Sequence, residues 1–466
     1  MTPLHGAFMS PPSLVWLRQD MRLADQAAIT AAAAQGPVVP VYVLDDGVAR
    51  QWAMGGASRW WLHHSLVSMD RNLWAVGSRL VLRRGDCAEQ LAAVARQAGA
   101  GQVHALRHYE PWWRNAQKAV GHALDLRLHD GMLLAPPGAV RTGDGGHYKI
   151  YTPFARALEQ IMPPSAPISA PDRLAAPDQW PDSDNLDDWR LLPTRPDWAD
   201  GMRAEWTPGE EGAKARLSDF LDEVRHYDAT RNLPSQEGTS RLSPHLHFGE
   251  ISIATLWYAL KGRDAGSAAW RRELIWRDYA HNQIVQFPAY GSAPAREAFE
   301  AMPWRDMAEA GDDFTAWTKG LTGYPIVDAG IRQLWGSGWM HNRVRMIAAS
   351  FLVKHLLIDW RHGARWFWDT LVDASYANNS VNWQWVTGSG VDANMFPRIM
   401  APLSQSPKFD AADYIRQWVP ELAHLGDNAI HDPDAFGRRP AGYPAKIIDH
   451  RAGRQRALAA FAAMKG

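Results

Sequence analysis

Two tryptophans, Trp383 and Trp385, stand one residue apart in the stretch ANNSVNWQW, just behind paired asparagines. Indoles stack on flat rings, and amides both donate and accept hydrogen bonds. The chain holds 24 tryptophans among 466 residues, more than a hydrophobic core needs. This composition indicates aromatic and amide chemistry around a bound ligand.

Hydroxyl side chains and one arginine precede a helical run in EGTSRLSPHLHFGEIS. Hydroxyls, free backbone N–H groups and a guanidinium at a helix N-terminus can bind an anion such as a phosphate. Ordinary N-capping by serine and threonine would explain the same pattern. His245 and His247 lack a carboxylate partner at a metal-binding spacing, so no metal is expected. The candidate anion ligands are Thr239, Ser240, Arg241 and Ser243.

The stretch WRRELIWRDY places a carboxylate beside indoles on one predicted helix. Glu273 lies between Trp270 and Trp276 and could hydrogen-bond a heterocycle that the indoles stack on. Alternatively, Glu273 and Arg277 form a surface ion pair at i, i+4 over tryptophans of the core. The sequence leaves both interpretations open.

The stretch WMHNRVRM puts Asn342, Arg345 and Met346 on one helical face and turns Arg343 elsewhere. An amide, a guanidinium and a thioether together suit an aromatic, partly anionic ligand. Asp373, in LVDASYANN, is a candidate partner for Arg345. A plain salt bridge between helices would explain that pair equally well.

Several enzyme classes lack their usual motifs here. The sequence has no H-E-x-x-H, no P-loop and no G-x-S-x-G elbow. The only cysteine, Cys87, excludes disulfides within the chain and cysteine-rich metal sites, and it fits a reducing, cytoplasmic setting. We expect no membrane span and no secretory signal. The remaining chemistry indicates a bound cofactor that supplies the reactivity.

The net charge of −1 conceals an uneven distribution. Residues 163–205 hold nine acids and four bases, whereas residues 331–368 hold six lysines or arginines and one aspartate. A local basic surface on a neutral protein is typical of a nucleic-acid binder. A solvated helix face would produce the same pattern.

The elements that position these residues are of two kinds. Residues 14–134 alternate short β-rich runs with alanine-rich helical segments, which predicts an α/β domain over residues 1–134 with a doubly wound parallel sheet. Residues 135–205 are rich in proline and acids and predict a long inter-domain linker. Residues 206–466 predict a larger, all-α domain.

Together these residues resemble the photolyase/cryptochrome family, and within it the class I-like bacterial enzymes for cyclobutane pyrimidine dimers. The matching stretches, in order, are LVWLRQDMRLADQAA, EGTSRLSPHLHFGE, ELIWR, TGYPIVDAGIRQLWGSGWMHNRVRMIAASFLVKHLLIDWR and ANNSVNWQW. The resemblance implies FAD, UV-damaged DNA as the partner, a cytoplasmic monomer, and light-driven electron transfer from reduced FAD to a flipped-out dimer. A cryptochrome-type photoreceptor, with FAD but no repair, is the alternative.

The resemblance also implies the residues that contact the cofactor. Asn379 would face the reactive flavin nitrogen, and Trp383, Trp360 and Trp304 would form a chain that carries electrons to the flavin. The expected FAD-binding residues are Tyr227, Thr239, Ser240, Arg241, Leu242, Ser243, Trp270, Arg277, Asn342, Arg345, Asp373, Ser375 and Asn379.

The lesion pocket follows from the same resemblance. Trp276 and Trp385 would clamp the dimer, and Glu273 would hydrogen-bond the pyrimidine edge. Met346 stands where dimer-repairing relatives carry a methionine. The resemblance therefore implies three catalytic residues: Glu273, Asn379 and Met346. The expected residues that bind DNA or the lesion are Arg231, Glu273, Trp276, Asn342, Arg343, Met346, Trp385, Arg398 and Gln405.

Three stretches depart from the family pattern. Ser375 replaces the second aspartate of a D-x-D pair, and VDANMFPRIMAP replaces a segment that carries a tyrosine and an asparagine near the lesion. Trp112 and Trp113 stand where folate-binding relatives carry Asn-Glu. A second, antenna chromophore is therefore left unidentified: a folate is not favoured, and a deazaflavin, a second flavin or an empty site stay open.

Overall fold

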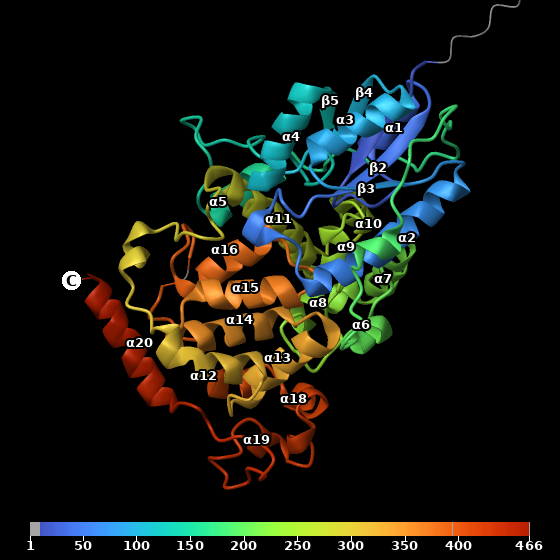
Figure 1. The fold of residues 1–466 in the computed structure, drawn as a ribbon. Helices are drawn as coiled ribbons and strands as arrows, with labels where there is room; N and C mark the ends of the chain where they lie inside the picture. Colours follow the sequence, from blue (N-terminus) through green and yellow to red (C-terminus); the bar gives the residue numbers. More distant parts are fainter. Residues whose placement is uncertain (1–9, 394, 466) are drawn as a thin grey trace, which may run out of the picture.

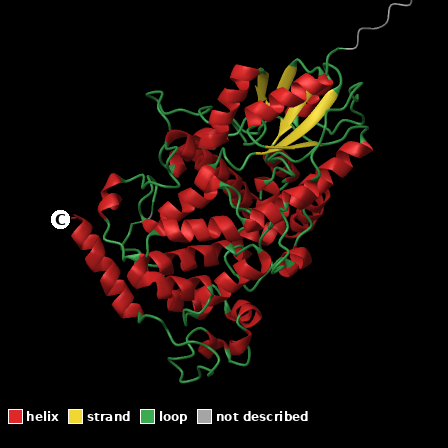
Figure 2. Ribbon diagram, in the orientation of Figure 1, coloured by secondary structure: helices red, strands yellow, loops and turns green. Residues whose placement is uncertain are grey.

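The strands of the computed structural model, which describes residues 10–393 and 395–465, lie together at one end of the molecule (Figures 1 and 2). They form one parallel sheet in the order β3-β2-β1-β4-β5. Each β-rich run identified in the sequence supplies one strand. The bounds are β1 Ser13–Leu17, β2 Val38–Leu44, β3 Val81–Arg84, β4 Gln102–Leu106 and β5 Asp125–His129.

Helices cover both faces of this sheet, as the sequence predicts. Successive strand side chains point to opposite faces, so Val15 and Leu17 join one core and Leu14 and Trp16 join the other. The first core includes α1 (Ala27–Ala33) and α2 (Gly56–Ala75), and the second includes α3 (Cys87–Ala98) and α4 (Pro111–Ala123). The doubly wound α/β fold is confirmed.

The described chain after β5 contains helices and no strands, which confirms the all-α second part (Figure 2). The segment that the sequence predicts as a linker carries two of these helices, α5 and α6. The bounds are α5 Tyr151–Glu159, α6 Asp200–Glu205, α7 Glu210–Glu223, α8 Tyr227–Thr230, α9 Ser243–His247, α10 Ile253–Ala259, α11 Ala265–Gln286, α12 Met307–Thr318, α13 Pro325–Ser337, α14 Asn342–Ser350, α15 Trp360–Thr370, α16 Tyr376–Thr387, α17 Pro402–Lys408, α18 Ala412–Trp418, α19 Asp427–Ile430 and α20 His450–Lys465.

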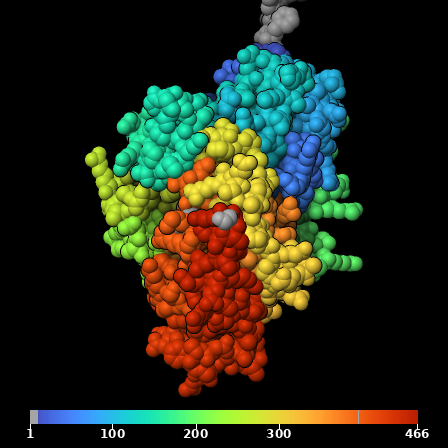
Figure 3. Space-filling model, turned by 90° about the vertical axis from the view of Figure 1, so that its left-hand side faces the viewer, coloured from blue at the N-terminus to red at the C-terminus, as the bar shows by residue number. Residues whose placement is uncertain are grey.

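Helices α13 to α16 surround the largest hydrophobic core, and α20 runs along the outside of the molecule (Figure 3). Gly338 adopts a φ of 69°, the left-handed conformation that ends α13. A π-helical turn, Phe351–His355, follows α14, and Arg456 of α20 donates a hydrogen bond to the His355 carbonyl. No helix in the described ranges is long and apolar enough to cross a membrane.

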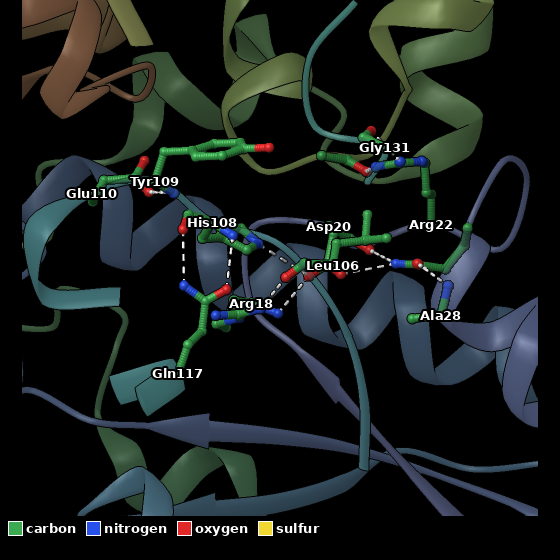
Figure 4. Close-up of polar contacts among 12 residues, drawn as sticks. Arg18, Asp20, Arg22, Ala28, Leu106, His108, Tyr109, Glu110, Gln117 and Gly131 are labelled. Atoms are coloured by element: carbon green, nitrogen blue, oxygen red, sulfur yellow. Dashed lines mark hydrogen bonds and ion pairs between the residues drawn. The ribbon is translucent and has the colours of Figure 1, made fainter. Parts of the chain in front are cut away.

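The loop after β1 joins the sheet to the helical part (Figure 4). Its Asp20 carboxylate accepts hydrogen bonds from the Arg18 backbone N–H at 2.6 Å and the Gln26 amide at 2.9 Å. The Arg22 guanidinium donates to the carbonyls of Gly249 and Gly131, each at 3.0 Å. Arg22 is 2% exposed, so these bonds satisfy a charge that water does not reach.

We predict that Gly249→Ala weakens this junction. Gly249 has a φ of 65°, and a Cβ there would lie 2.1 Å from the Gln19 carbonyl oxygen. Gly99 is the matched control, because its φ is 64° and nothing lies within 4 Å of its Cβ position. Gly99→Ala should lower the free energy of unfolding by about 1 kcal/mol. Gly249→Ala should lower it by roughly 2 kcal/mol more, because the backbone must move.

Thermal melting of both variants, each loaded with FAD, measures the difference. Equal melting temperatures for the two variants would contradict the close packing at Gly249.

Candidate functional site

A cavity of about 470 Å³ lies within the helical part, a volume in the usual range for small-molecule sites. Helices α11, α14 and α16 and the segment that leads into α9 form its walls. Every residue expected to bind FAD lines it except Asn379, and every residue expected to bind the lesion lines it except Arg398 and Gln405.

The hydroxyl-rich end of the cavity differs from simple helix capping. Helix α9 is five residues long, and no side chain caps it. The Ser243 hydroxyl instead donates a 2.6 Å hydrogen bond to the Asp373 carboxylate. The N-capping alternative for Ser243 is therefore wrong. Arg241 adopts a φ of 49° and forms ion pairs with Glu205 and Glu237.

The pair of Arg345 and Asp373 is confirmed as a contact. Two parallel hydrogen bonds of 3.0 and 2.9 Å join the guanidinium of α14 to the carboxylate that precedes α16. Both side chains line the cavity. The pair therefore links separate segments of the chain and also faces the ligand space.

Helix α11 does not form the surface ion pair that its spacing allows. Arg277 turns away and donates to the carbonyls of Met132 at 2.9 Å and Leu246 at 3.4 Å, and burial lowers its pKa. Glu273 instead pairs with Arg231 at 2.5 Å. Although burial alone would lower the pKa of Arg231, the Glu273 carboxylate raises it. The interpretation of a Glu273–Arg277 pair is thus wrong.

Arg343, which lies near Arg231, makes two further contacts at the cavity wall. The Arg343 guanidinium donates to the Asn232 amide oxygen at 2.7 Å and lies 4.4 Å from the centroid of the Phe409 ring. Burial, with the neighbouring charge of Arg231, lowers the pKa of Arg343. The sulfur of Met346 lies 3.8 Å from the Arg343 guanidinium. Because Glu273 compensates the charge of Arg231, Arg343 leaves this group of side chains with one net positive charge.

Helix α16 sends its two tryptophans in different directions. Trp385 lines the cavity, whereas Trp383 is 3% exposed and its ring centroid lies 5.0 Å from that of Phe367. A Cβ at Gly363 would lie 2.2 Å from the Trp383 ring, so this glycine makes room for the indole. Between them, the Gln384 amide donates to the carbonyls of Tyr290 and Ala293.

The cavity face of α16 also carries residues that the sequence interpretation missed. Asn378 and Asn382 line the cavity with Trp385, at a spacing of four and three residues that places all three on one side of the helix. Asp392, within the departing stretch VDANMFPRIMAP, lines it as well. Helical periodicity could have predicted that these two asparagines share the cavity side of the helix with Trp385.

Asn379, expected to face the reactive flavin nitrogen, is not among the residues that line the cavity. Its amide nitrogen donates to the Ala364 carbonyl at 3.0 Å, and the side chain is 9% exposed beside the cavity wall. Ser375 caps α16 by accepting from the Asn378 N–H at 3.4 Å. The serine that replaces the usual aspartate thus has a structural contact as well as a place in the cavity lining.

The remaining predicted residues do not line the cavity. Trp360 is buried in the same core as Trp383, and Trp304 is half-buried at the edge of that core. Arg398 is exposed and Gln405 is half-buried, both outside the cavity lining. Asn394, in the departing stretch, lies outside the described residues.

A second, much smaller cavity lies between the sheet and the helical part. Its volume is about 40 Å³, and four tryptophans are among the residues that line it. A flavin ring does not fit there without movement of these side chains, which are Trp52, Trp112, Trp113 and Trp368. No cluster of three potential metal ligands occurs in residues 10–393 and 395–465.

The lining of the large cavity fits FAD. One end offers hydroxyls and guanidinium groups for a pyrophosphate, and the rest offers indoles, amides and a carboxylate for flat heterocycles. FAD contains both kinds of group in one molecule.

Comparison with known proteins agrees with this assignment. Residues 270–463 match the family model described as the FAD binding domain of DNA photolyase, and residues 13–172 match the model described as DNA photolyase. An Agrobacterium fabrum protein named Deoxyribodipyrimidine photo-lyase is 46% identical over 97% of this chain and 98% of its own.

A solved structure and a cryptochrome also resemble this chain. The structure of a bacterial class III photolyase from Agrobacterium tumefaciens is 45% identical, with a TM-score of 0.94 over 100% of both chains. Its class differs from the class I-like resemblance of the sequence. Cryptochrome-1 of Arabidopsis thaliana is 32% identical over 90% of this chain and 64% of its own. The chain therefore belongs to the photolyase/cryptochrome family, and its helical part contains that family's FAD-binding domain.

Proposed function

We propose that this protein repairs cyclobutane pyrimidine dimers in DNA by light-driven electron transfer from reduced FAD. One observation carries the proposal: Trp276 and Trp385, the two expected walls for a flipped-out dimer, line the same cavity as the residues expected to hold FAD. The name of the Agrobacterium fabrum relative, a deoxyribodipyrimidine photo-lyase, supports the same reaction.

The side chains have distinct roles in this proposal. FAD, when bound, supplies light absorption and the transferable electron. Trp276 and Trp385 stack on the two bases and exclude water, and Met346 packs against them. The Glu273 carboxylate accepts a hydrogen bond from the pyrimidine edge, and its ion pair with Arg231 keeps it in place until the lesion enters.

DNA binding and electron supply use other residues. Arg231, Arg343 and Arg398 would hold phosphates around the lesion, and Gln405 would touch the strand. The buried pair Trp383 and Trp360, with Trp304 at the edge of the core, would return the cofactor to its reduced state. We further propose residues 1–134 and 206–466 as the two domains, and a cytoplasmic monomer.

A cryptochrome-type photoreceptor is the second candidate, because Cryptochrome-1 shares 32% identity with most of this chain. Such a protein would use FAD and light but would not need a stacking pocket for a damaged base. The two candidates therefore differ in what Trp276 contributes.

Trp276→Ala should weaken binding to dimer-containing DNA by about one to two powers of ten, because base–aromatic stacking is worth roughly 1–3 kcal/mol. Affinity for undamaged duplex should barely change, because that binding depends on phosphates. Trp74→Ala is the control: Trp74 is 64% exposed on α2, away from the cavity. Equal losses on both DNAs, or loss of FAD, would assign Trp276 to the core and favour the cryptochrome.

Trp383→Phe should block light-driven reduction of protein purified with oxidised FAD. Trp383 is the proposed first donor, and phenylalanine fills the core without an oxidisable indole. The decay of the oxidised flavin absorbance under illumination, with an external reductant, measures the rate. Repair by protein reduced chemically should continue. A mutant that is photoreduced at the wild-type rate would remove Trp383 from the chain.

Arg343→Ala should reduce the slope of log K against log salt by about one unit, because one phosphate contact is lost. Arg84→Ala serves as the control, since Arg84 lies at the end of β3 and pairs with Asp46. DNA affinities measured at several salt concentrations decide the point. An unchanged slope would exclude a phosphate contact by Arg343.

A further inference from the structure

Trp276 does not stand alone at the cavity wall. The ring of Tyr151, the first residue of α5, stacks on it with centroids 3.4 Å apart and planes inclined by 3°. Trp276 lines the cavity, whereas Tyr151 is absent from the lining. The tyrosine therefore lies behind the indole and leaves its other side to the ligand.

Two hydrogen bonds hold Tyr151 in this position. Its hydroxyl donates to the Arg272 carbonyl of α11 at 3.2 Å, and its backbone N–H donates to the Asp392 carboxylate at 2.8 Å. Tyr279 meets both stacked rings edge-on, with centroid distances of 5.6 Å to Tyr151 and 5.5 Å to Trp276. The ring of Tyr151 is thus restrained at its hydroxyl, at its backbone and along one edge.

Helix α5 itself is anchored by apolar packing. Phe154 and Leu158 are 2% and 1% exposed and join the core that contains Trp270 and Tyr279 of α11. No local side chain caps the start of α5, so Asp392 satisfies an N–H that the helix leaves unpaired. The segment predicted as a linker therefore contributes a rigid element to the site.

Asp392 connects the two tryptophan walls. It follows α16, the helix that carries Trp385, and it binds the start of α5, where Tyr151 backs Trp276. One carboxylate from the stretch VDANMFPRIMAP thus links the segment that follows Trp385 to the residue that backs Trp276. This contact gives that departure from the family pattern a physical role.

We propose that Tyr151 is a positioning residue for the lesion: it holds the plane of Trp276 so that the free face of the indole receives the pyrimidine. The inference rests on the proposed repair function. Binding to a side chain that is already ordered avoids the loss of rotamer freedom during association. Tyr151 acts through Trp276 and does not itself touch the ligand.

A double-mutant cycle tests the proposal on protein loaded with FAD. Tyr151→Leu removes the stacked ring, and Tyr151→Phe keeps the ring but removes the hydroxyl. The affinities to measure are those for a dimer-containing duplex and for an undamaged duplex of the same sequence, in the wild-type and Trp276→Ala backgrounds. Flavin absorbance and melting temperature report whether each variant folds.

We expect Tyr151→Leu to weaken damaged-DNA binding by roughly three- to tenfold, the range of an aromatic pair, with no change on undamaged DNA. Tyr151→Phe should stay within about twofold of wild type for the same reason. In the Trp276→Ala background, Tyr151→Leu should have no further effect, because its target is gone.

Three results would overturn the proposal. Tyr151→Leu could weaken damaged-DNA binding equally in the Trp276→Ala background, or it could weaken binding to undamaged DNA by the same factor. It could also bind damaged DNA more tightly, which would mean that Tyr151 occupies the face of the indole that receives the base. Trp276→Ala that binds damaged DNA like wild type would reject the lesion pocket itself, and the inference with it. If Tyr151→Leu loses FAD, Asp392→Ala, which frees the start of α5 but keeps both rings, replaces it with the same criteria.

Discussion

The Asp373 carboxylate joins three segments of the chain around the cavity. It accepts two hydrogen bonds from Arg345 of α14 and one from Ser243 of α9, and it stands just before α16. The carboxylate is buried, so removing the Arg345 guanidinium would leave its charge uncompensated, at a cost of roughly 3–5 kcal/mol. The orientation of α14 and α16 depends on this contact, and with it the placement of Met346 and Trp385.

The abundance of tryptophan reflects several uses of one side chain. Indoles stack at the cavity wall, pack in the core beside Phe367, and close the small cavity under the sheet. Neighbours in sequence serve different uses because α16 turns Trp383 and Trp385 to different sides. Gln384 holds the loop around Tyr290 and so limits rotation of the helix between these two environments.

Sequence patterns predicted the parts of the molecule that follow local rules. Short β-rich runs located all five strands, and helical spacing placed Asn342, Arg345 and Met346 together at the cavity. The expectation that Arg343 turns elsewhere was wrong, because Arg343 lines the same cavity. Partners across the fold were harder to predict. Spacing allowed an ion pair between Glu273 and Arg277. Arg277 instead donates hydrogen bonds to buried carbonyls, and Glu273 pairs with Arg231, which is far away in sequence. Likewise, nothing local indicates that Asp392 reaches Tyr151, because that contact depends on how α5 packs on α11.

We propose that this cavity repairs pyrimidine dimers with light. The most direct measurement illuminates the chemically reduced, FAD-loaded protein with dimer-containing DNA and follows the number of dimers against a dark sample. We expect dimers to disappear under illumination and to persist in the dark, with intact pyrimidines recovered. Dimers that persist in the light, although the protein retains reduced FAD and binds the DNA, would contradict it.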